Sequence, residues 1–220
     1  MAISKLNFNS LNVAPTAGKA VSFDSGADDL EATLSGGSMV FIKKLTASSS
    51  GTLSFVNGAS SVVLDSTYKE YVFTFKNIHA SANNAEVGIL GSIDSGSNYN
   101  VAKTTTHFDA GHAEDGSAIV FTYETSHDVA QGTGLHDLTR ANGNANDSNA
   151  CGTLHLFNPS STTFVKHFVA DMGYVYGTEY GAFRSMSAGY FNTTSAIDAI
   201  QFKMSSGNID AGTITLYGIN

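Results

Sequence analysis

The chain is poor in the residues that cross-link, kink or charge a protein. Of its 220 residues one is cysteine, two are proline and none is tryptophan. A single cysteine excludes an internal disulfide and a zinc site built from several thiolates. With two prolines, few strands are barred from pairing in a sheet. The lone thiol, Cys151, precedes Gly152 at the start of a strand-like run, which favours a structural role.

Charge is also scarce. Charged residues make up 14% of the chain, against roughly 25% in typical soluble domains. Glycine, serine, threonine and asparagine take their place, which is typical of solvent faces made by strands and turns. The formal net charge is −8, and Lys43-Lys44 is the only adjacent basic pair. A nucleic-acid partner is therefore not expected, because phosphate binding needs clustered lysine and arginine.

Long apolar runs are missing as well. No stretch approaches the roughly 18 apolar residues of a membrane span, and the first residues, MAISKLNFNSLNV, lack the apolar region of a signal peptide. We therefore expect a protein made in a cytoplasm, without membrane insertion and without export by a classical signal.

Alternation with a period of two residues recurs along the chain, and helical periodicity is almost absent. Hydrophobic residues make up 42%, which suffices for a core. The pattern predicts an all-β fold, an antiparallel β-sandwich or jelly roll of about a dozen short strands with little or no helix. The expected strands cover residues 52–56, 60–64, 70–78, 86–93, 101–108, 118–123, 153–157, 163–176, 185–192, 199–204 and 213–219.

Three segments leave alternatives open. Asn57-Gly58 predicts a tight hairpin between the runs 52–56 and 60–64. Residues 163–176 fit a long or bent strand better than a short helix. Residues 1–38 differ in texture from 39–220: they form either an arm that docks on a partner or the first two strands of the sandwich domain.

The segment HFDAGHAEDG, residues 107–116, is the one cluster that looks like chemistry. On a strand, His107 and Asp109 share one face and His112 lies on the other. The carboxylates do not follow the spacing of a calcium loop. The glycines favour a turn, so we expect a solvated polar loop and no metal. A metal site here would draw on His107, Asp109, His112, Glu114 and Asp115.

Catalytic motifs are not found. No G-x-S-x-G elbow precedes a helix, and there is no P-loop and no G-x-G-x-x-G that opens a helix. Neither a catalytic residue nor a cofactor is expected.

Recognition is expected in two segments. Residues 133–151, TGLHDLTRANGNANDSNAC, predict a long exposed loop, and such loops often carry binding. Residues 172–183, MGYVYGTEYGAF, place tyrosines among glycines, which can stack on sugars, fill an interface or pack in the core. The candidates are His136, Arg140, Asn142, Asn144, Tyr174, Tyr176 and Tyr180.

A family resemblance is carried by four stretches: KKLTASSSGTLSFVNG, SSVVLDSTYKEYVFTFKNIHA, FNPSSTTFVKHF and GYFNTTSAIDAIQFKMSSGNIDAGTITLYGI. They resemble a family of virion structural proteins of marine tailed bacteriophages, such as phages of marine cyanobacteria and other ocean bacteria. The resemblance covers nearly the whole chain, and the ending TLYGI is its most specific part. Residues 107–150 depart most from the family pattern. The resemblance implies a non-enzymatic, β-rich and oligomeric particle component, and it carries over no catalytic residue.

We therefore expect a virion protein, assembled in the host cytoplasm and displayed on the particle exterior, with a tail-fibre-like or receptor-binding role in host attachment. One alternative is a head decoration or cement protein that stabilises the capsid. A further alternative is a glycan depolymerase, which would need a carboxylate pair in a groove. The expected partners are other tail or capsid proteins, a host-surface glycan or protein, and further copies of the chain, with a trimer favoured.

Overall fold

The chain divides into two compact units, Met1–Ser38 and Met39–Asn220. The structure, a computed structural model, describes residues 20–23, 30–33, 38–177 and 181–220. In the first unit, β1 (Ala20–Phe23) and β2 (Leu30–Thr33) pair antiparallel in a two-stranded sheet of their own. Docking through this unit stays a prediction.

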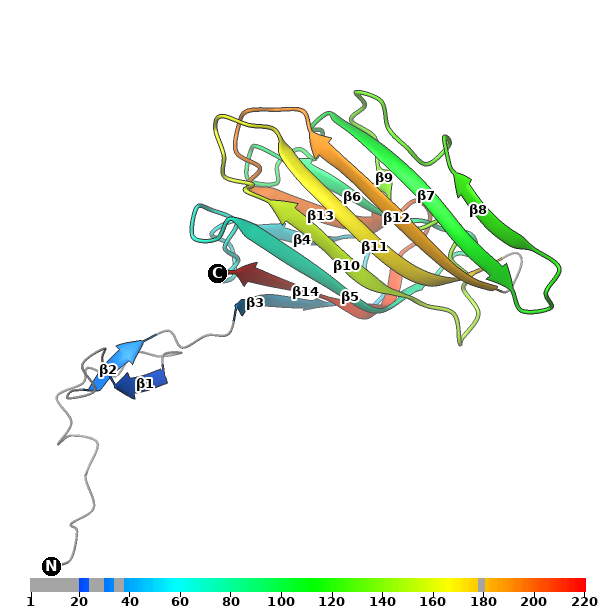
Figure 1. The fold of residues 1–220 in the computed structure, drawn as a ribbon, viewed down its shortest axis with the longest axis horizontal. Coiled ribbons are helices and arrows are strands. Elements are labelled where there is room, and N and C mark those ends of the chain that lie inside the picture. The colour runs from blue at the N-terminus through cyan, green and yellow to red at the C-terminus, as the bar shows by residue number, and fades with distance from the viewer. Residues whose placement is uncertain (1–19, 24–29, 34–37, 178–180) are drawn as a thin grey trace, which may run out of the picture. The chain divides into compact units, whose positions relative to one another are not determined.

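The second unit is a sandwich of two antiparallel sheets (Figure 1). The larger sheet has eight strands in the order β3-β14-β5-β10-β11-β12-β7-β8. Their bounds are β3 Met39–Thr46, β14 Ile209–Ile219, β5 Glu70–Ala80, β10 Ala150–Phe157, β11 Lys166–Tyr176, β12 Gly181–Phe191, β7 Lys103–Ala113 and β8 Ile119–Tyr123.

The smaller sheet has four strands in the order β4-β13-β6-β9. These are β4 (Leu53–Val56), β13 (Ala199–Met204), β6 (Val87–Ser92) and β9 (His136–Asp137). The described residues contain no helix. The predicted all-β sandwich is confirmed, whereas a jelly-roll arrangement of its strands stays a prediction.

The core lies between the sheets and is built by alternation along the strands. In β5 the buried Tyr71, Phe73 and Phe75 point inward, as their spacing predicts. The ring of Phe202 in β13 lies 5.1 Å from that of Phe73 and 5.0 Å from that of Phe75, both edge-on. Edge-to-face aromatic packing of this kind holds the two sheets together.

The expected hairpin at Asn57-Gly58 is wrong. Gly58 has a φ of 78° and the chain turns there, but residues 60–64 form no strand. The Asn57 side chain instead accepts a hydrogen bond from the Leu64 backbone N–H at 2.9 Å. Val62 and Leu64 pack into the core, and β4 pairs with β13. The choice at residues 163–176 is settled by β11, which is a long strand.

Candidate functional site

The segment HFDAGHAEDG supplies most of strand β7, so its interpretation as a solvated loop is wrong for His107 and Asp109. Both side chains are 0% exposed on the inner face of the large sheet, whereas His112 points to solvent on the opposite face. Glu114 and Asp115 lie in the turn between β7 and β8. Only this turn matches the expected loop.

His107 and Asp109 belong to a buried polar network with Ser185 of β12. The His107 Nε2 atom lies 3.2 Å from the Ser185 Oγ and 3.3 Å from the Asp109 Oδ1. The Ser185 hydroxyl donates to the same Asp109 oxygen at 2.5 Å. The His107 Nδ1 atom donates to the backbone carbonyl of Asp137 at 3.0 Å.

This geometry differs from a Ser-His-Asp catalytic triad. In a triad the carboxylate and the serine contact opposite nitrogens of the imidazole. Here both contact Nε2, and a main-chain carbonyl occupies Nδ1. Ser185 is 1% exposed and its two partners are 0% exposed. The arrangement satisfies buried polar groups and has no contact with solvent.

Electrostatics stabilise the Asp109 carboxylate inside the sandwich. Burial by itself would raise its pKa, but interactions with the His107 and Ser185 side chains and the nearby Arg140 charge lower the pKa below its ordinary value. The Tyr174 hydroxyl donates to the same carboxylate at 3.3 Å. Burial and the Asp109 charge raise the pKa of Tyr174, which stays a hydrogen-bond donor.

The segment 133–151 covers this network, so its interpretation as a long exposed loop is wrong. It contains β9, and it buries His136 and Asn142. The Asn142 Nδ2 donates to the Ala85 carbonyl at 2.8 Å and to the Thr139 Oγ1 at 2.7 Å. The polar side chain of Asn142 therefore finds its hydrogen-bond partners inside the protein, so a polar sequence does not make this segment exposed.

Arg140 and a histidine–carboxylate pair close one side of the network. The Arg140 Nη1 lies 2.8 Å from the Glu124 Oε1, and its guanidinium lies 5.4 Å from the Tyr176 ring centroid. The His127 Nδ1 lies 2.9 Å from the Asp137 Oδ2. Its hydrogen bond to Asp137 raises the pKa of His127, whereas burial raises the pKa of Asp137.

The remaining recognition candidates lie apart. Tyr174 is buried, and Tyr176 is partly buried with its ring stacked 4.5 Å from that of Phe183. Asn144 is exposed, and Tyr180 lies outside the described residues. The structure therefore buries His136, Asn142 and Tyr174 and leaves Arg140 partly exposed. The six candidates that it describes do not form a common surface.

Among the residues described, four buried side chains have polar atoms with no hydrogen-bond partner: Asn142 through its Oδ1, Ser187 through its Oγ, and two titratable side chains. The titratable two are Lys103, through its Nζ, and His136, through both ring nitrogens. Both side chains are 0% exposed. Burial lowers the pKa of Lys103 to about 8 and, with the charges of His107 and Lys103, lowers the pKa of His136 to about 3. Burying these groups costs stability.

Replacing Lys103 with methionine is expected to raise the free energy of unfolding by about 1–3 kcal/mol at pH 7, because the substitution keeps the side chain's length and removes an unpaired ammonium. The gain should shrink above about pH 8, where the folded wild type sheds the proton. Urea unfolding measures it, with the exposed Lys76→Met as control. If Lys103→Met instead lowered the free energy of unfolding by more than about 1 kcal/mol, the ammonium would have to be well solvated in the folded protein.

A second feature, which the sequence reasoning missed, is the solvent-facing side of β11, β12, β7 and β8, here called the outer face (Figure 1). Large apolar side chains are exposed on it, and Ile119 and Phe121 of β8 reach 80% and 79%. Met186, Phe108 and Tyr123 form one row across three strands. A signal was present in the sequence: β11 and β12 carry apolar residues at both parities, so apolar side chains such as Val169 and Met186 face outward beside the charged Asp171 and Arg184.

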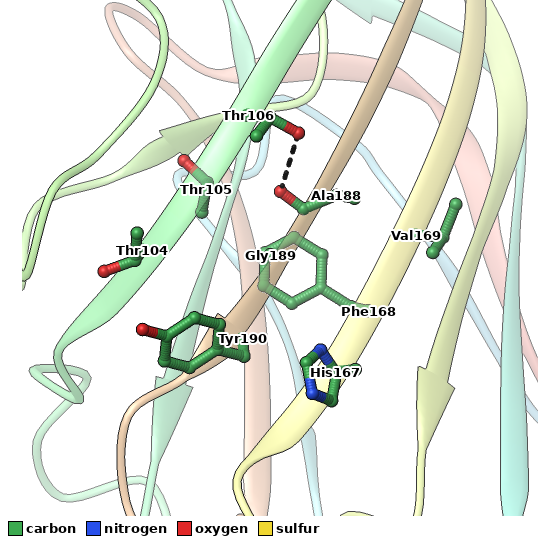
Figure 2. Close-up of a pocket in the computed structure, with 9 residues that line it drawn as sticks. All are labelled: Thr104, Thr105, Thr106, His167, Phe168, Val169, Ala188, Gly189 and Tyr190. Carbon is green, nitrogen blue, oxygen red and sulfur yellow. Dashed lines mark hydrogen bonds between the residues drawn. The ribbon is translucent and has the colours of Figure 1, made fainter.

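A shallow hollow of about 260 Å³ lies on this face between β7, β11 and β12 (Figure 2). The His167 and Tyr190 rings stand at one end, 5.7 Å apart. Thr104 and Thr106 line the β7 side, and the Thr106 hydroxyl donates to the Ala188 carbonyl at 3.4 Å. Gly189 also lines the hollow, and a Cβ added there would come within 2.8 Å of the Phe168 ring, so a larger residue would clash with that ring. The hollow therefore joins aromatic rings to hydroxyl groups on a strand framework.

Comparison of the chain with protein-family models, with curated protein sequences and with solved structures finds no match. Within the described residues, no three His, Cys, Asp or Glu side chains come together as a group that could hold a metal ion. The same residues contain no helix long and apolar enough to cross a membrane.

Proposed function

We propose that the protein is a non-enzymatic virion structural protein, displayed on the exterior of a phage particle with a tail-fibre-like or receptor-binding role. The observation that carries the proposal is that the polar network lies inside the protein, whereas large apolar side chains lie on its outer face. The polar network around His107 and Asp109 is enclosed, whereas apolar side chains such as Ile119 and Phe121 are exposed on the outer face. Such exposed patches mark sites of contact with other molecules.

The hollow at His167 and Tyr190 supports contact with a host-surface glycan. A tyrosine has an apolar ring body and a polar tip, and the neighbouring threonines add hydroxyl groups that can exchange hydrogen bonds with a sugar. A depolymerase, in contrast, needs two carboxyl groups flanking a bound sugar. Asp109 is enclosed, and the outer-face Asp171 is paired with Arg184. The geometry therefore favours binding over hydrolysis.

Gold-labelled antibody on purified particles tests the proposed location. A role in attachment predicts label at the tail. In that case excess host polysaccharide should compete with the cell surface and reduce adsorption of particles to cells. Label over the whole head would favour the decoration alternative instead. Particles without label, from a lysate that contains the protein, would contradict both virion roles.

A further inference from the structure

We propose that β8 is a self-pairing edge, through which two copies of the chain join their large sheets antiparallel about a twofold axis centred on Phe121. This proposal goes beyond the virion role and does not rest on it. Among the residues that the structure describes, β8 is the last strand of the large sheet, and β7 is its only neighbour there (Figure 1). Edge strands present unpaired backbone N–H and C=O groups, which an added strand can satisfy.

The hydrogen-bond pattern of the β7–β8 pair determines which groups are available. The Ala113 N–H donates to the Ala118 carbonyl at 3.0 Å, and the Glu124 N–H donates to the His107 carbonyl at 2.9 Å. These two bonds fix the alternation of the antiparallel ladder. Val120 and Thr122 accordingly direct their backbone groups toward β7. The backbone groups of Ile119, Phe121 and Tyr123 point away from the sheet, and the Tyr123 carbonyl there accepts a hydrogen bond from the Thr122 hydroxyl at 3.3 Å.

These outward positions are symmetric about Phe121, so a second copy of β8 complements the first. Antiparallel pairing about this residue sets Phe121 opposite its counterpart and Ile119 opposite Tyr123 of the second copy. Each of the three pairs exchanges two backbone hydrogen bonds, because every residue in it directs both groups outward. The partner is the same patch of a second copy, as a closed twofold contact requires.

The side chains agree with this pairing. Ile119 and Phe121 are 80% and 79% exposed, and Tyr123 is 40% exposed. Directly opposite residues in an antiparallel pair lie on one face, where aromatic and β-branched neighbours stabilise each other. Pairing would cover these three side chains and extend the apolar outer face from one copy into the next.

The other edges of the two sandwich sheets are protected in ways that β8 is not. β8 reads IVFTY, with no charged residue and no proline. The opposite edge of the large sheet, β3, carries Lys43 and Lys44. The edges of the small sheet are short: four residues in β4 and two in β9. Lysine and short length are the usual protections against edge-to-edge pairing.

Five residues of strand cover less than the roughly 1,000–1,600 Å² of a stable interface, and each copy carries a formal charge of −8. The contact should therefore be weak in dilute solution and tighten with added salt, which screens repulsion between the copies. A neighbouring contact within an assembly would hold it at high effective concentration.

Sedimentation of the full chain, from micromolar to millimolar concentration and at low and high salt, tests the pairing. Wild type should shift from monomer to dimer, and Phe121→Lys should weaken the association at least about tenfold. The matched control is Phe41→Lys, at a residue 61% exposed on the β3 edge, which should leave association unchanged.

Hydrogen exchange gives a second readout on wild type alone. The amides of Ile119, Phe121 and Tyr123 should exchange fast in the dilute monomer and become protected at high concentration. A monomer at every concentration would overturn the proposal, and so would a dimer that Phe121→Lys leaves intact or one in which these amides stay unprotected.

Discussion

Truncating Phe202 to alanine is expected to lower the free energy of unfolding by about 3–5 kcal/mol. The side chain is 0% exposed, and its ring contacts Phe73 and Phe75 of the opposite sheet at 5.1 and 5.0 Å. Removing it would leave a cavity where β13 meets β5. A loss of this size is a large share of the roughly 5–15 kcal/mol that stabilises a typical domain.

Urea unfolding followed by circular dichroism measures this loss, since the chain has no tryptophan for a fluorescence signal. Phe41→Ala is the control, because Phe41 is 61% exposed, and it should cost about 0.5 kcal/mol or less. A cost below about 1 kcal/mol for Phe202→Ala, well under the range for buried aromatics, would contradict the close packing of the two sheets.

His136 is expected to make the fold sensitive to acid. Its pKa is lowered from 6.5 to about 3 by burial and by the charges of His107 and Lys103. Between these values the unfolded chain binds a proton that the folded protein does not, so stability falls as the pH falls. The loss approaches about 1.4 kcal/mol per pH unit below 6.5, or roughly 2–3 kcal/mol between pH 6.5 and 4.5.

The difference between wild type and His136→Leu isolates this effect. The difference is needed because His127 acts in the opposite direction: its raised pKa gives stability that is present at low pH and lost as the pH rises past its folded value. The variant should gain stability relative to wild type as the pH falls from 6.5 to 4.5. His167→Leu, at an exposed residue, is the control. Parallel pH profiles for wild type and His136→Leu would show that His136 charges readily in the folded protein.

Most strands of the sandwich could be predicted from the sequence because alternation is a local signal, although β3 was not among the expected strands. The expected strand 199–204 matches β13 residue for residue, and β5, β6 and β8 begin and end close to their expected bounds. The hairpin at Asn57-Gly58 failed because Val62 and Leu64 gain more from burial in the core than from pairing with β4. The turn itself forms at Gly58, and only the second strand of the hairpin is absent, because tertiary packing prevailed over the local pattern of residues 60–64.

The polar network could not be predicted because its partners are far apart in the chain. His107 contacts Ser185, which is 78 residues away, and the backbone of Asp137, which is 30 residues away. Locally, alternating polar side chains look like a solvent face. Only the sheet order brings β12 and the segment after β8 against β7, and only then do His107 and Asp109 have buried partners.

The position of β8 at the edge of the sheet could not be predicted from the sequence either. Its five residues read as an ordinary strand, and nothing in them indicates an edge. The strand order makes it the end of the large sheet, and the ladder then directs the backbone of Ile119, Phe121 and Tyr123 outward. The proposed pairing edge therefore follows from the strand order and not from the sequence of β8.

Quantitative mass spectrometry of purified particles, washed in high salt, tests the virion role most directly. The protein is expected to stay with the particles at a fixed number of copies, in constant ratio to the major capsid protein. A protein that is abundant in the lysate but absent from washed particles, or present in a ratio that varies between preparations, would contradict the virion role.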